Sequence, residues 1–265
     1  MNQDFSEKAS YSINDLIKIM KMLRAPGGCP WDREQTHQSI RKNFIEETYE
    51  AVEAIDAEDP KLLQEELGDV LLQIIFHTEM EEEKGSFSFE DVVTGICRKL
   101  IVRHPHVFGD VKVNGSEQVL ANWDEIKKQQ KGQKKSADTL ESVSRALPAL
   151  MRSTKVQQRA ARAGFDWPEV SGALEKIHEE AEELEKAVAG GVREEIAEEL
   201  GDLLFSAVNV SRFVKVDAEE ALTRATDKFT TRFARVERMA EERGINMKET
   251  SIEELDKLWE ESKSR

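Results

Sequence analysis

The chain has 265 residues, and its 38 Lys and Arg residues against 53 Asp and Glu residues give a net charge of −15 at pH 7. That negative field disfavours nucleic acid and acidic membrane surfaces as partners, and we expect neither. With two cysteines, a polar amino terminus and no apolar run near about 18 residues, we predict a soluble cytoplasmic protein without disulfide bonds.

The first strongly patterned segment is a predicted helical hairpin. Apolar residues recur at helical spacing between Ile45 and Ile55, and again between Leu67 and Ile75. The sequence AEDP, residues 57–60, separates the two segments, and Pro60 suits the first turn of a helix. Strand-like alternation is almost absent, so we predict an all-α fold.

Acidic pairs lie on both helices of this hairpin. Glu47 and Glu50 are three residues apart, as are Glu66 and Asp69, so each pair occupies one helical face. Antiparallel packing of the helices can bring the four carboxylates around one space. A divalent cation there would offset their mutual repulsion, and Mg²⁺ suits carboxylates combined with water and substrate phosphates. A purely solvated acidic face is the alternative, and repetition of the pattern disfavours it.

A glycine precedes the last carboxylate of this set. Gly68 lies inside the second helix, where glycine costs about 1 kcal/mol relative to alanine. Close approach of another group to the backbone, or close packing of two helices, explains it equally well.

Basic and aromatic residues follow the hairpin. Lys99 and Arg103 are four residues apart and can present an ammonium and a guanidinium group to phosphate oxygens. Trp123 lies near the end of this half, whereas Trp31 precedes the hairpin, where we expect it to pack in the core. Residues 127–138 carry five lysines, so we interpret them as a solvated tether, with docking to an acidic partner or RNA as the alternative.

The second half repeats the first. The sequence EELGD recurs at residues 198–202, and Glu180 lies 19 residues before Glu199, as Glu47 does before Glu66. Glu183 and Asp202 complete a second acidic set, with Gly201 in the place of Gly68. The remaining counterparts are Trp167, expected in the core, Lys228, Arg232 and Trp259. We therefore predict tandem helical-bundle domains over residues 1–128 and 139–265, joined by a linker over residues 129–138.

Several of these motifs resemble the MazG family of bacterial nucleoside triphosphate pyrophosphohydrolases. The matching segments are GGCPWDREQTHQSIRKNFIEETYEAVEAI, EELGDVLLQIIFH and RHPHVFGD in the first half, and AGFDWP, EEAEELEKAV and EELGDLLFSAVN in the second. The resemblance covers nearly the whole chain. It implies the all-α NTP pyrophosphatase fold, Mg²⁺ dependence, hydrolysis of NTP to NMP and pyrophosphate, and homodimers in which helices of two subunits pack together.

The resemblance also implies roles for individual residues. The metal ligands of the second half would be Glu180, Glu183, Glu199 and Asp202. Phosphate contacts would come from Lys176, Lys228 and Arg232, with Trp259 beside the nucleotide. In the first half the same pattern falls on Glu47, Glu50, Glu66, Asp69, Lys99, Arg103 and Trp123.

The sequence departs from the family pattern at three positions. Cys97 and Thr226 stand where relatives often carry Asn, which puts one nucleotide contact in doubt in each half. Asn43 stands where the second half has Lys176, so we expect the second half to be the active one.

For the mechanism, we expect metal-assisted attack of water on the α-phosphorus. Glu179 or Glu198 would orient or deprotonate the water, while Lys228 and Arg232 would stabilise the departing pyrophosphate. Two alternatives stay open. One is a nucleotide-sensing protein of low turnover that docks a regulatory protein partner, and the other is a narrower dUTP or phosphoribosyl-ATP pyrophosphohydrolase.

Overall fold

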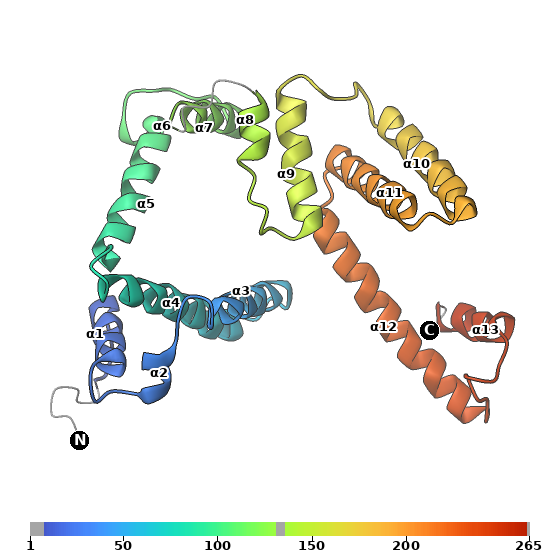
Figure 1. The fold of residues 1–265 in the computed structure, drawn as a ribbon, viewed down its shortest axis with the longest axis horizontal. Helices are drawn as coiled ribbons and strands as arrows, with labels where there is room; N and C mark the ends of the chain where they lie inside the picture. The colour runs from blue at the N-terminus through green and yellow to red at the C-terminus, as the bar shows by residue number, and fades with distance from the viewer. Residues whose placement is uncertain (1–7, 131–135, 264–265) are drawn as a thin grey trace. The chain divides into compact units, whose positions relative to one another are not determined.

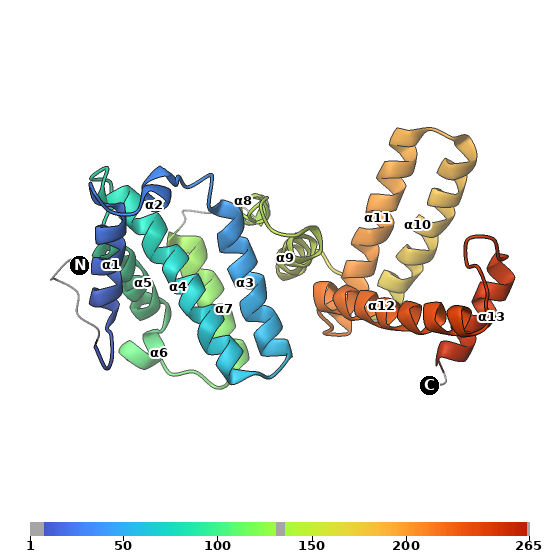
Figure 2. The ribbon, with the colours of Figure 1, turned by 90° about the horizontal axis from the view of Figure 1, so that it is seen from below.

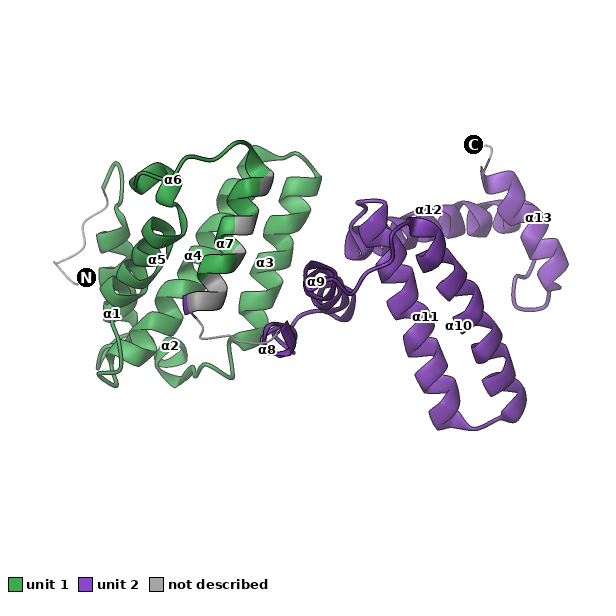
Figure 3. Ribbon diagram, turned by 90° about the horizontal axis from the view of Figure 1, so that it is seen from above, with its two compact units in different colours: residues 1–126 green, residues 127–265 purple. Residues whose placement is uncertain are grey.

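The structure is a computed structural model that describes residues 8–130 and 136–263. The described residues form helices and connecting loops, which confirms the all-α prediction (Figure 1). The chain divides into two compact units, unit 1 over Met1–Ile126 and unit 2 over Lys127–Arg265 (Figure 3). The last helix of the first half ends at Gln130 and the next begins at Ser136, so residues 131–135 of the predicted linker lie outside the described residues.

Unit 1 is built around the predicted hairpin. Its helices are α1 (Ile13–Arg24), α2 (Pro30–Glu34), α3 (Arg41–Asp56), α4 (Pro60–Glu82), α5 (Phe89–Arg103), α6 (Pro105–Phe108) and α7 (Ser116–Gln130). The hairpin bends where predicted, because the Asp59 side chain accepts hydrogen bonds from the backbone N–H groups of Lys61 and Leu62 while Pro60 begins α4. Helices α3 and α4 lie side by side (Figure 2).

The core of unit 1 lies at the carboxyl-terminal half of α4. Met20, Ile40, Ile75, Phe76 and Met80 are buried together there, so α1 and the α2–α3 loop cover this part of the helix. The opposite half of α4 carries the acidic residues and lies outside this cluster.

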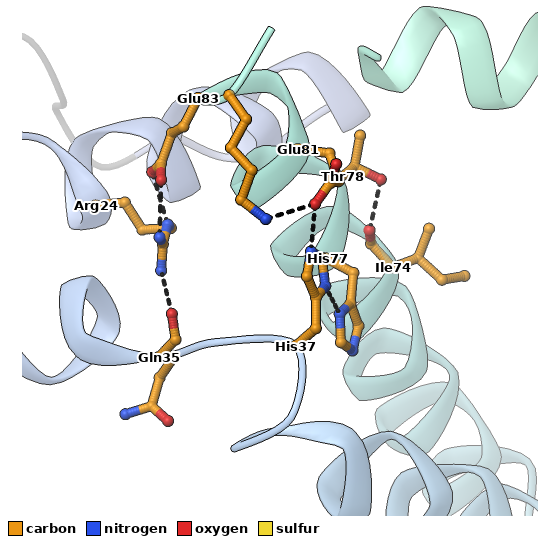
Figure 4. Close-up of polar contacts among 9 residues, drawn as sticks. Arg24, Gln35, His37, Ile74, His77, Thr78, Glu81 and Glu83 are labelled. Carbon is orange, nitrogen blue, oxygen red and sulfur yellow. Dashed lines mark hydrogen bonds and ion pairs between the residues drawn. The ribbon is translucent and has the colours of Figure 1, made fainter. Parts of the chain in front are cut away.

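Polar contacts hold the α2–α3 loop onto α4 at the same end (Figure 4). His37 of the loop contacts His77 through Nδ1 and Glu81 through Nε2. Arg24 at the end of α1 donates to both carboxylate oxygens of Glu83. The start of α3 is thereby fixed against α4.

Unit 2 repeats the hairpin within a different set of surrounding helices. It contains α8 (Ser136–Glu141), α9 (Ala149–Arg162), α10 (Val170–Gly190), α11 (Arg193–Phe213), α12 (Ala218–Glu242) and α13 (Ile252–Lys263). The hairpin is α10 and α11, and it turns at Gly191, whose φ of 72° lies in the left-handed region that glycine adopts without strain.

The buried cluster of unit 2 lies between α12 and α13. Val236, Met239, Ala240 and Leu258 form it, with Trp259 packed against its edge. As in unit 1, this cluster does not include the acidic ends of the hairpin. The expectation that Trp31 and Trp167 pack in the core is wrong, since the two residues are 56% and 48% exposed. Trp31 lies in the short helix α2 and Trp167 in the loop before α10, where it lies against Gly172.

Candidate functional site

Acidic side chains from α3 and α4 converge in unit 1. Glu47, Glu66 and Asp69 each offer a carboxylate oxygen, and these oxygens lie within 4.8 Å of one another. The convergence follows from the hairpin, because α3 and α4 pack along their length and the equal spacing of the acidic residues places them at one level. All three residues are partly buried.

The same arrangement recurs in unit 2. Glu180 from α10 meets Glu199 and Asp202 from α11, again with carboxylate oxygens within 4.8 Å. Here the three environments differ, since Glu180 is buried, Glu199 is partly buried and Asp202 is exposed. We name these three-residue groups the unit 1 cluster and the unit 2 cluster.

The fourth predicted carboxylate of each set lies outside the cluster but within electrostatic reach. In unit 1, desolvation first and then the charges of Glu50 and Asp69 raise the pKa of Glu66. In unit 2, desolvation and then the charges of Glu183, Glu180 and Asp202 raise the pKa of Glu199. Glu50 and Glu183 therefore border the clusters.

The chemistry of the two clusters fits a metal ion. Closely spaced carboxylates that raise one another's pKa are unfavourably placed until a cation joins them. Oxygen ligands on two facing helices are the donors that a hard divalent ion takes. Either cluster can hold such an ion, and the ligand role of each residue stays a prediction.

The two units differ in the residue one turn before the first ligand. In unit 2, Lys176 Nζ lies 2.6 Å from Glu180 Oε1 and 3.0 Å from Glu179 Oε1. Hydrogen bonding to Glu180 and then to Glu179 raises the pKa of the Lys176 ammonium group. In unit 1 the equivalent residue is Asn43, which carries no charge. The unit 2 cluster thus has a counter-charge on the preceding turn of its own helix, at a position where unit 1 has an uncharged side chain.

The two residues predicted to handle the attacking water lie at the edge of the unit 2 cluster. The Glu179 side chain is 57% exposed and forms an ion pair with Lys176. Glu198 is exposed, and its charge contributes to the raised pKa of Glu199. Their catalytic role stays a prediction.

Apart from Lys176 on α10, the predicted phosphate and base contacts of unit 2 lie on α12 and α13. The guanidinium carbon of Arg232 lies 5.9 Å from the centre of the Trp259 ring, and Phe229 lies 5.1 Å from the same ring. Lys228 borders an open groove of about 370 Å³ along α12 with Val216 and Arg224. Among the described residues, no hydrogen bond or ion pair links Lys228 or Arg232 to the unit 2 cluster.

In unit 1 the corresponding residues lie on α5 and α7. Lys99 is exposed on α5, next to the end of the helix where Arg103 lies. His104 caps α5 and meets the edge of Trp123 on α7, with ring centres 4.7 Å apart. The structure thus places Lys99, Arg103 and Trp123 on helices other than those of the unit 1 cluster.

The two helical glycines have open space beside them. A Cβ atom built on Gly68 or Gly201 would meet no heavy atom within 4 Å. Close helix packing inside either unit therefore does not explain these glycines. Close approach of a group from outside the unit stays a prediction.

Sequence reasoning missed the contacts that fix each hairpin to the loop before it. In unit 1 these are the contacts of His37 with His77 and Glu81. In unit 2, Arg212 of α11 donates two hydrogen bonds to Asp166, one of them at 2.9 Å. The spacing of His77 and Glu81, four residues apart on one helical face, was the available signal.

The MazG nucleotide pyrophosphohydrolase domain matches residues 35–108 and 169–237 of the sequence, and these two segments span the two hairpins. Among the described residues, no helix combines the length and apolar character needed to cross a bilayer.

Three relatives show how far the similarity extends. A Thermotoga maritima protein named nucleoside triphosphate pyrophosphohydrolase/pyrophosphatase MazG is 46% identical over 97% of this chain and 98% of its own length. An Escherichia coli K12 protein named nucleoside triphosphate pyrophosphohydrolase is 42% identical over 95% of this chain and 97% of its own length. The uncharacterized protein YabN of Bacillus subtilis is 49% identical over 92% of this chain and 50% of its own length. The chain therefore belongs to the MazG family, with the family's domain present twice.

Proposed function

We propose that this chain is a Mg²⁺-dependent nucleoside triphosphate pyrophosphohydrolase that cleaves the α–β phosphoanhydride to release NMP and pyrophosphate. The observation that carries the proposal is the convergence of three carboxylates from two helices in each unit. The names of the Thermotoga and Escherichia relatives support the same activity.

The position of each residue in unit 2 suggests its role in the proposed reaction. Glu180, Glu199 and Asp202 would hold the ion, with Glu183 bordering them. Bound there, Mg²⁺ would offset negative charge on the phosphate oxygens as the anhydride breaks. Glu179 and Glu198 lie at the exposed edge of the cluster, where a carboxylate can orient or deprotonate water.

Basic and aromatic side chains recognise the rest of the nucleotide. Lys228 and Arg232 bind the phosphates, and Trp259 stacks on the base, supported by the Arg232 and Phe229 contacts that hold the indole in place. In unit 1, Lys99, Arg103 and Trp123 are the counterparts.

We infer further that unit 2 is the active half. Lys176 places a cation beside the unit 2 cluster, whereas the equivalent residue of unit 1, Asn43, carries no charge. We propose that the units correspond to domains over residues 1–128 and 139–265.

The working form is proposed to be a homodimer in the cytoplasm. Large apolar side chains on α5 and α12 are exposed within each unit, and Ile96, Leu222 and Phe229 are 45%, 56% and 56% exposed. A second copy that covers these helices would also explain why, among the described residues, neither Lys228 nor Arg232 forms an ion pair with the unit 2 cluster. A regulatory protein partner stays a proposal from the sequence.

The experiment is a substrate panel with purified full-length chain, Mg²⁺ and canonical, oxidised or deoxyuridine triphosphates. We expect NMP and pyrophosphate in equal amounts. Release of NDP and orthophosphate, or tight nucleotide binding without product, would contradict the proposal. Glu199→Gln and Glu66→Gln, compared as separate variants, assign the activity to a unit. We expect a loss of about 100-fold or more in kcat for the first and a small change for the second.

A further inference from the structure

The ion pair of Lys176 with Glu180 lies beside the place where the proposed metal ion would bind. Lys176 lies one helical turn before Glu180 on α10, and its ammonium group is 2.6 Å from Glu180 Oε1. Glu180 Oε1 or its partner oxygen also belongs to the cluster that faces Glu199 and Asp202. The same carboxylate therefore serves a lysine and borders the candidate metal position.

Burial makes this counter-charge important. The Glu180 side chain is only 6% exposed, and a buried carboxylate is costly unless a cation or several hydrogen-bond donors accompany it. Lys176 meets that need from a side chain that is itself 37% exposed, so its ammonium end stays connected to solvent.

Unit 1 has an acidic cluster but no lysine at the position equivalent to Lys176. Asn43 lies four residues before Glu47, as Lys176 lies four residues before Glu180. Glu47 is less buried than Glu180 and has no lysine at that position. The duplication therefore supplies a comparison within one molecule, in which the acidic clusters match and the neighbouring residue differs.

We propose that Lys176 is the resident counter-cation of Glu180, that an incoming divalent ion displaces it, and that the released ammonium group then binds the phosphates of the substrate. The inference deepens the proposed function and rests on it. A flexible lysine stem permits this exchange, because the ammonium group is a point charge that can move while its helix stays in place. Metal binding and phosphate binding are thereby coupled through one side chain.

Substitution of Lys176 should therefore have opposite effects on the binding of the metal ion and on the binding of the nucleotide. Loss of the lysine removes a competitor of the metal, so metal affinity without nucleotide rises. The same loss removes a phosphate contact, so nucleotide affinity in the presence of metal falls. A lysine that acted only through the net charge of the chain would change metal affinity no more than another exposed lysine on the same helix.

The test measures Mn²⁺ binding by calorimetry, without nucleotide, in full-length chain. Glu66→Gln with Asp69→Asn removes the unit 1 cluster, and this double variant is the parent. We expect Lys176→Asn to bind Mn²⁺ at least about threefold more tightly than the parent, as suits a partly exposed ion pair. Lys186→Gln, an exposed lysine on the same helix, controls for net charge and should leave the affinity within about 1.5-fold.

A reciprocal substitution tests the inference where Lys176→Asn does not fold. In a parent without the unit 2 cluster, made by Glu199→Gln with Asp202→Asn, Asn43→Lys should weaken Mn²⁺ binding to unit 1 at least about threefold. Binding of a non-hydrolysable NTP with saturating Mn²⁺ should weaken in Lys176→Asn and not in Lys186→Gln.

The outcomes separate the two proposals. Equal or weaker Mn²⁺ binding in Lys176→Asn, with an intact parent site, overturns the displacement and leaves the proposed function standing. A parent chain that binds no Mn²⁺ overturns the metal site itself, and the displacement with it.

Discussion

The Nδ1 atoms of His37 and His77 lie 2.7 Å apart, and the two rings are parallel within 3°. One nitrogen must donate a proton and the other must accept it, so the contact fails when both rings are fully protonated. On its far side His37 meets Glu81 at 2.6 Å through Nε2, while Phe44 of α3 packs beside His77. Lys84 also pairs with Glu81. This contact joins the loop before α3 to α4.

We predict that unit 1 loses stability on mild acidification. Burial, and then the positive charge of His37, lower the pKa of His77 below its usual value. Between that lowered pKa and about 6.5 the unfolded chain binds more protons than the folded one, so stability falls as the pH drops through this window. Thermal unfolding of the full chain from pH 8 to pH 5 measures the effect.

A pair of variants assigns this acid sensitivity. His77→Phe keeps a ring against Phe44 but removes the titrating group, so the dependence of the melting temperature on pH should flatten in this range. His178→Gln removes an exposed histidine of unit 2 and should leave the dependence as in the parent. Equal slopes in His77→Phe and the parent would show that His77 is not responsible.

Carboxylate repulsion predicts the behaviour of the metal-free clusters. Because the folded-state pKa values of Glu66 and Glu199 are raised, folding becomes less favourable as the pH rises from about 4.5 through the raised values. Glu199→Gln should therefore raise the melting temperature of metal-free chain at pH 7. Mg²⁺ should then stabilise the variant less than the parent. A lower metal-free melting temperature in the variant would contradict this explanation.

The open space at Gly201 predicts a conflict between stability and activity. Gly201→Ala should stabilise the chain by about 0.5–1 kcal/mol, since alanine favours a helix and its Cβ atom meets nothing inside the unit. We expect activity to fall by about tenfold or more, because the space is proposed to serve a substrate or second subunit. Chemical denaturation and a pyrophosphate assay measure the two effects.

Gly68→Ala is the matched control for that experiment. Its surroundings are equally open, so it should stabilise unit 1 similarly, but activity should persist if unit 2 is the active half. Full activity in Gly201→Ala would refute the proposal that this glycine makes room for a substrate or a second subunit.

The exposed apolar faces of α5 and α12 predict that a charged substitution there will dissociate the proposed dimer. Leu222→Asp changes a side chain that is 56% exposed on α12, so it should alter the stability of an isolated chain by less than about 0.5 kcal/mol. We expect it to shift the mass measured by sedimentation from two chains towards one. Ile252→Asp, at a position that is 72% exposed at the start of α13, should leave the mass unchanged. An identical shift in both variants would argue against an interface on α12.

Local sequence rules explain why the hairpins and their acidic clusters were predictable. Pro60 and the helical spacing of apolar residues define α3 and α4, and equal separations of acidic residues place Glu180 opposite Glu199. The spacing does not say how much of an apolar stripe is covered, and Ile45 and Tyr49 are each 51% exposed. Contacts between distant residues escaped prediction for a related reason. His37 and His77 are 40 residues apart, and either could have been an ordinary surface histidine.

The buried clusters of both units lie away from the acidic ends of their hairpins, with Phe76 and Met80 in one unit and Met239 and Leu258 in the other. In each unit, the acidic end of the hairpin should therefore open locally more easily than the helices around the buried cluster. Backbone amides near Glu66 and Glu199 will exchange with solvent deuterium sooner than those near the cores, and ligand binding will slow them selectively. Part of the binding energy is then used to order the helices that hold the ligand, so apparent affinities will underestimate the strength of the individual contacts.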